Sequence, residues 1–81
     1  MAKPPRKKNI VGRKVADARM AAKPPLTQDA LSGKLAKSGV QLDRAAIAKI
    51  ENNLRRVLDY EVKALADALG VSVASLFEDA K

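Results

Sequence analysis

The stretch from residue 44 to residue 56, RAAIAKIENNLRR, combines long cationic side chains with alanines that offer only a methyl group. Arginine, and lysine less rigidly, can donate hydrogen bonds to both O6 and N7 of guanine, and an alanine methyl can contact a thymine methyl. Small residues also let a helix backbone come close to whatever surface the cations reach. This pattern favours close contact with an anionic partner.

A helix over residues 43–53 would sort these side chains onto two sides. Asp43 suits its N-cap. Placed at intervals of about 100° along the helix, the residues of one stripe are apolar: Ala46, Ile47, Ile50 and Leu54. The other side is small and basic, and consists of Arg44, Ala45, Ala48, Lys49 and Asn52. We expect the stripe to pack in a core, and Asn53 to take a left-handed conformation at the exit.

Apolar periodicity and helix-end signals predict further helices on both sides of this one. They cover about 11–22, 27–38, 59–69 and 72–77. Expected ends are Pro24–Pro25, Gly39 and Gly70, and Thr27 is the expected N-cap of the second helix. The expected core residues of the other helices include Val11, Val15, Ala30, Leu31, Leu35, Val62, Leu65, Leu69, Val73, Leu76 and Phe77. No strand pattern is visible, so the sequence predicts an all-α domain of five short helices.

The charge of the chain is concentrated in its first part. Residues 1–23 carry +7, residues 24–57 carry +3 and residues 58–81 carry −3. Such asymmetry indicates a polyanionic partner, with nucleic acid ahead of an anionic membrane surface. Residues 1–9, basic and without apolar periodicity, are expected to be a disordered arm, and residues 10–81 the folded domain.

Composition weighs against several other classes of function. The 81 residues include no cysteine and no histidine, which excludes disulfides and the usual zinc sites. A chain of this size rarely encloses a catalytic pocket, so we expect no enzyme, no cofactor and no small-molecule ligand. No apolar run approaches the ~20 residues that span a bilayer, and we expect a cytoplasmic protein that does not bind membranes.

Five segments in order resemble the Cro and phage-repressor type of helix-turn-helix transcriptional regulators. They are VGRKVADAR, LTQDAL, AIAKIENN, DYEVKALADALGVS and SLF, and the resemblance runs from about Val11 to Phe77. It implies a compact five-helix, lambda-repressor-like DNA-binding domain that acts as a homodimer on a two-fold symmetric site in double-stranded DNA. The second and third helices would form the helix-turn-helix, with the third helix in the major groove.

The resemblance also implies roles for individual residues. Base contacts would come from Arg44, Ala45 and Lys49, joined on the same side of the helix by Ala48; Ala46 also matches but borders the apolar stripe. Phosphate contacts would come from Thr27, Gln28, Asn52, Arg55 and Arg56. Arg19 and Glu51 match a pair that forms a structural ion pair between the first and third helices.

Two other interpretations remain open at this stage. An antitoxin or adaptor could use the same fold to bind a protein, and the basic arm could bind nucleic acid without regard to sequence. For the residues 43–53 themselves, the simpler alternative is a surface helix whose apolar side packs and whose charges are solvated. The charge distribution and the ordered motifs favour sequence-specific DNA binding and transcriptional regulation, with a repressor-like outcome.

Overall fold

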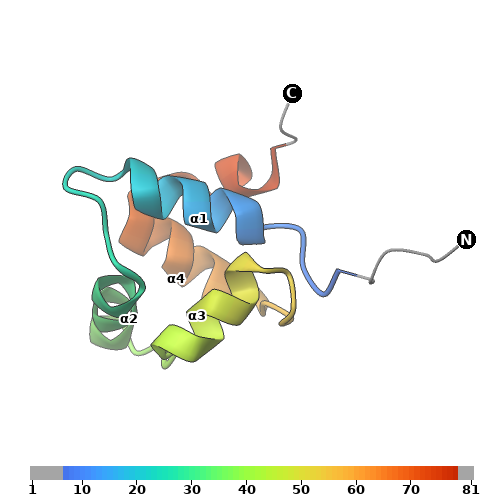
Figure 1. Cartoon of the computed structure of the whole chain (residues 1–81), viewed down its shortest axis with the longest axis horizontal. Helices are drawn as coiled ribbons and strands as arrows, with labels where there is room; N and C mark the ends of the chain where they lie inside the picture. The colour runs from blue at the N-terminus through green and yellow to red at the C-terminus, as the bar shows by residue number, and fades with distance from the viewer. Residues whose placement is uncertain (1–6, 79–81) are drawn as a thin grey trace, which may run out of the picture.

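A computed structural model describes residues 7–78 of the chain, in which all regular secondary structure is helical and no strand occurs. Four α-helices follow one another: α1 (Gly12–Ala21), α2 (Gln28–Lys37), α3 (Arg44–Glu51) and α4 (Asp59–Leu69). A 3₁₀ helix, η1 (Ala74–Phe77), completes the fold (Figure 1). The all-α prediction is therefore confirmed, while the fifth predicted helix is a single 3₁₀ turn.

The helices begin and end where local side-chain chemistry directs them. The Oγ1 of Thr27 accepts from the amide of Ala30 at 2.9 Å, and Oδ1 of Asp43 accepts from the amide of Ala46 at 2.8 Å. Gly39 and Gly70 have φ angles of 86° and 71° after α2 and at the end of α4. Both caps and both glycine stops were expected from the sequence, and each satisfies backbone groups that a helix end leaves unpaired.

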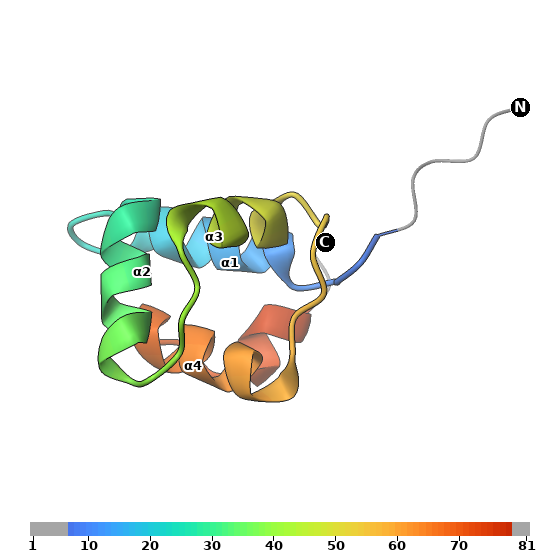
Figure 2. The same cartoon turned by 90° about the horizontal axis from the view of Figure 1, so that it is seen from below.

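One core lies between two layers of helices. Figure 2 shows α1 and α3 on one side, α4 and η1 on the other, and α2 across one end. α1 packs against α3, α4 and η1, and α2 packs against both α3 and α4. The most deeply buried side chains are Val15, Leu31, Leu35, Ile47, Ile50, Leu65 and Leu76. The apolar stripe predicted for α3 thus supplies Ile47 and Ile50 to the centre of the molecule.

Several residues expected in the core are exposed instead. Leu54 is 64% exposed, because α3 ends at Glu51 and Asn53 turns the chain with a φ of 63°. In the short 3₁₀ turn only Leu76 faces inward, so Val73 and Phe77 are 41% and 46% exposed. The methyl group of Ala30 is exposed as well.

Gly12 allows α1 to cross very close to the end of α3. A Cβ at this position would collide with the carbonyl oxygen of Ile50, and would lie 3.1 Å from the carbonyl oxygen of Glu51. Gly33 in α2 differs, because a Cβ there would meet no atom within 4 Å. Close packing thus explains Gly12, and it does not explain Gly33.

The folded domain begins earlier than the sequence predicted. Lys8 and Asn9, expected in the arm, are hydrogen-bonded to the chain after α3; the amide of Lys8 donates to the carbonyl oxygen of Asn53 at 2.9 Å. Lys7 is exposed, and residues 1–6 of the expected arm lie outside the described residues. Within residues 7–78, no helix has the length and apolar character needed to cross a membrane.

Candidate functional site

The outward side of α3 presents the cations and alanines predicted for base reading. Arg44, Ala45 and Lys49 are exposed, and Ala48 is half-buried. The Arg44 side chain is 70% exposed, and its Nη1 lies 3.9 Å from Oδ2 of Asp29 in α2, whose side chain is 72% exposed. Exposed pairs at this distance contribute little to stability, so the guanidinium remains available to a partner.

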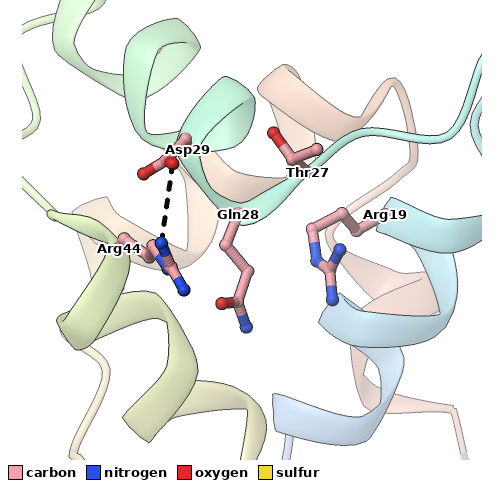
Figure 3. Close-up of a pocket in the computed structure, with 5 residues that line it drawn as sticks. All are labelled: Arg19, Thr27, Gln28, Asp29 and Arg44. Atoms are coloured by element: carbon pink, nitrogen blue, oxygen red, sulfur yellow. Dashed lines mark ion pairs between the residues drawn. The ribbon is translucent and has the colours of Figure 1, made fainter.

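The N-terminus of α2 faces the same space as Arg44. A cleft between α1, α2 and α3 is lined by Arg19, Thr27, Gln28, Asp29 and Arg44. Figure 3 shows the Gln28 side chain between the guanidinium groups of Arg44 and Arg19. Thr27 uses its hydroxyl oxygen as the N-cap acceptor of α2. The positive end of the α2 dipole and the exposed side chain of Arg44 therefore border one cleft, together with the carboxylate of Asp29.

Arg19 and Glu51 form a bidentate ion pair that joins α1 to the end of α3. Nε and Nη2 of Arg19 donate to the two carboxylate oxygens of Glu51 at 2.8 and 3.0 Å, and Nη1 donates to the carbonyl oxygen of Leu26 at 2.9 Å. Both side chains are largely buried, 14% and 8% exposed. The bond to Glu51 raises the pKa of Arg19 above its ordinary value. This pair fixes the orientation of α3 relative to α1.

Gln28 belongs to the same polar cluster. Its Nε2 donates to Oε1 of Glu51 at 3.0 Å, an interaction that the sequence did not predict. The carboxamide therefore links the start of α2 to the end of α3, and a phosphate contact by Gln28 would have to use its remaining polar groups or its backbone amide.

The loop after α3 contains the other residues predicted to contact phosphate. Asn52 is exposed, with its Nδ2 donating to the carbonyl oxygen of Ala48 at 3.0 Å, and Arg56 is exposed. Arg55 is different, because Nη1 and Nη2 donate to the carboxylate of Glu61 at 2.9 and 3.2 Å. Nη1 also donates to the carbonyl oxygen of Arg56 at 2.7 Å. Arg55 is thus engaged in an ion pair, with Nε–H and one N–H of Nη2 left for another acceptor.

Glu61 is a structural residue that sequence reasoning missed. It is only 4% exposed, and its Oε1 accepts from the amide of Leu58 at 2.9 Å, immediately before α4. The hydrogen bonds from Arg55 lower the pKa of Glu61, against the effect of burial, and the same bond raises the pKa of Arg55. A glutamate at the third position of a predicted helix is a signal for such a cap, and it could have identified this residue.

Asn9 was also missed, although an asparagine just before an apolar-periodic segment is a helix-start signal. Its Oδ1 accepts from the amides of Val11 and Gly12 at 3.1 and 2.8 Å. Its Nδ2 donates to the carbonyl oxygens of Ile50 and Arg55 at 3.1 and 2.7 Å. Asn9 therefore joins the start of α1, the end of α3 and the following loop.

The exposed side chains on the outer side of α3 are cationic or polar, apart from Ala45. Among residues 7–78, no three carboxylates gather in a group that could hold a metal ion. Among the side chains around α3, the exposed N–H donors are those of Arg44, Lys49, Asn52 and Arg56, which suit phosphate and base-edge acceptors, and Asp29 is an exposed carboxylate beside them. Comparison of the chain with models of protein families, with curated proteins and with solved structures gave no match.

Proposed function

We propose that the protein is a sequence-specific DNA-binding transcriptional regulator, repressor-like, in which α2 and α3 act as a helix-turn-helix. The observation that carries this proposal is the small, cationic outward side of α3, which shares a cleft with the N-terminus of α2 through Arg44. Two packed helices with these features match the requirements of a reading helix and a helix that crosses the phosphate backbone.

The proposed mechanism divides the work between two sets of residues. Arg44 and Lys49 contact base edges, and the methyl groups of Ala45 and Ala48 admit the helix to the groove and meet thymine methyls. Phosphates are bound by residues on either side of α3: Thr27, Gln28, Asn52, Arg56 and the remaining donors of Arg55. Phosphate contacts set affinity and register, whereas base contacts set preference among sequences.

Two copies on a two-fold symmetric site would double these contacts. Val73 and Phe77, 41% and 46% exposed, are apolar side chains available for contact between the copies. The proposed place of action is the cytoplasm, on chromosomal or phage DNA.

Selection of bound duplexes from a random pool tests this proposal. The expected result is a palindromic consensus, which would show base reading and two-fold assembly together. Equal recovery of all sequences would overturn sequence-specific recognition in favour of non-specific binding.

Substituting Gln28→Ala should weaken binding to all duplexes alike, and an unchanged affinity would remove Gln28 from the phosphate-binding set.

A protein-interaction module, such as an antitoxin or adaptor, is the second candidate. It is favoured by apolar side chains exposed near the start of the domain and in the loop after α3: Ile10 is 72%, Leu54 64% and Leu58 50% exposed. A protein partner held by such side chains would bind with little dependence on salt, whereas DNA binding weakens steeply as salt rises. Salt-insensitive binding of a protein partner, together with no shift of any duplex, would support this candidate over the first.

A further inference from the structure

Asn9 makes a set of hydrogen bonds that reaches across the sequence. It accepts from two amides at the start of α1 and donates to Ile50 and Arg55, which lie 41 and 46 positions further along the chain. Nδ2 of Asn53 donates in return to the carbonyl oxygen and Oδ1 of Asn9, at 3.2 and 3.1 Å. We call these contacts, with the bond from the amide of Lys8 to the carbonyl oxygen of Asn53, the Asn9 clasp.

The Asn9 clasp places a cation of the N-terminal segment beside the cations of the loop after α3. Lys8, Arg55 and Arg56 line one cleft together with two leucines, Leu54 and Leu58. Glu61 neutralises Arg55 through their ion pair, so the excess positive charge of the cleft comes from Lys8 and Arg56. Apolar walls beside charges focus the field at such a cleft.

We propose that Asn9 is a positioning residue, which holds Lys8 beside Arg56 so that this cleft binds one phosphate of the DNA backbone next to the site read by α3. The inference rests on the proposed function and deepens it, because it adds Lys8 and Asn9 to the residues that set affinity. A cation held in place before binding loses less conformational freedom on contact than one in a free arm.

The position of the cleft follows from the fold. The start of α1 and the end of α3 lie at the same end of the molecule, and the loop after α3 turns there (Figure 1). Asn52, at the C-terminal end of α3, is exposed close by in the sequence. A duplex that lies along α3 would therefore meet Arg44 near the start of the helix and the cleft lined by Lys8 and Arg56 beyond its end.

The test is the salt dependence of duplex binding by four variants of the full chain. Lys8→Ala should lower the slope of log affinity against log salt by about 0.9, the value for one phosphate contact. Asn9→Ser retains a short acceptor for the α1 amides but cannot reach the carbonyl oxygens of Ile50 and Arg55, and it should lower the slope to a similar degree. The double variant should show no further decrease, because both changes remove the same contact. The matched control is Lys63, an exposed lysine on α4. Lys63→Ala removes the same charge and should leave the slope unchanged.

Thermal unfolding followed by circular dichroism accompanies each titration, so that every slope is measured on folded protein. Lys8 takes part in the Asn9 clasp only through its backbone amide, so Lys8→Ala should fold normally.

An unchanged slope for Lys8→Ala would overturn the phosphate site, and a lowered slope for Lys8→Ala with an unchanged slope for Asn9→Ser would overturn the positioning role. A lack of duplex binding by the unsubstituted chain would overturn the proposed function and this inference with it, whereas normal binding with unchanged slopes would overturn the inference alone.

Discussion

The two ends of α3 differ in the kind of contacts that they make with the rest of the molecule. At the N-terminal end, the Arg44 guanidinium meets only Asp29, at 3.9 Å and in solvent. At the C-terminal end, Glu51 is paired with Arg19, Gly12 brings the α1 backbone against Ile50, and Asn9 bonds to the carbonyl oxygen of Ile50. The difference indicates that polar and backbone contacts anchor the C-terminal end, whereas the N-terminal end is held by burial of Leu42 and Ile47 and presents Arg44 to solvent. Substitutions at the anchored C-terminal end should therefore change the free energy of unfolding, and substitution of Arg44 at the presented end should change DNA binding.

Glu51→Ala should have the largest effect on the anchored end. It would leave the guanidinium of Arg19 buried without its carboxylate, and would also remove the acceptor of Gln28, at a cost of about 3 kcal/mol in the free energy of unfolding. Urea unfolding measures this cost. The matched control is Asp67→Ala, which breaks the exposed pair with Lys63 and should cost less than about 0.5 kcal/mol. Equal costs for the two variants would contradict an anchored C-terminal end.

Gly12→Ala should cost about 2 kcal/mol, because the added methyl group would collide with the backbone carbonyl of Ile50. Backbone on both sides of the contact can move only if α1 and α3 separate. Urea unfolding again gives the free energy. A variant as stable as the parent would show that the two helices are not held at this separation.

The pair between Arg55 and Glu61 should make stability depend on acid. The folded-state pKa of Glu61 is lowered, so its contribution is present above its unfolded pKa of about 4.3 and is lost as pH falls through the lower folded pKa. Glu61→Gln should therefore cost about 1.5 kcal/mol at neutral pH and progressively less below about pH 4. A difference between parent and variant that stays constant down to about pH 2 would contradict this role for Glu61.

Gly33→Ala should have a small effect of the opposite sign. Its position in α2 is open, so alanine adds helix propensity without a collision, and stability should rise by about 0.5–1 kcal/mol. Comparison with Gly12→Ala, the same substitution in another helix, isolates the contact with α3. A loss of stability for Gly33→Ala would show that an unseen constraint acts on α2.

Local signals were sufficient to predict most of the helices. Thr27, Asp43, Gly39 and Gly70 act within a few residues of themselves, and an apolar stripe needs only its own periodicity. The same rules predicted that Leu54 would continue the stripe of α3, and this was wrong because the helix ends three residues earlier. Whether a side chain near a helix end remains on its stripe depends on where the helix stops.

The candidate site was harder to predict, because its supports join distant segments. The charges on the outer side of α3 follow from periodicity. The resemblance implied the pairing of Arg19 with Glu51, and the structure contains this ion pair. The bond of Gln28 to Glu51 and the bonds of Asn9 to Ile50 and Arg55 depend on which segments lie side by side, and spacing alone does not contain that information. Arg55, expected at phosphate, is paired instead with Glu61, only six positions further along the chain, and the place of Glu61 at the third position of α4 was the local signal for this role.

The central claim is that the presented end of α3 reads DNA bases while the anchored end supports it. The most direct measurement compares the affinity for the selected duplex with that for a scrambled duplex, in the parent, in Arg44→Ala and in Arg13→Ala. Arg13 is an exposed arginine on α1 that, like Arg44, is paired with an exposed aspartate. Arg44→Ala should lower the discrimination, which is the difference in binding free energy between the two duplexes, by about 1–3 kcal/mol. Its free energy of unfolding should change by less than about 0.5 kcal/mol. Arg13→Ala should keep the discrimination of the parent. Unchanged discrimination in Arg44→Ala, or an equal loss in both variants, would contradict the claim.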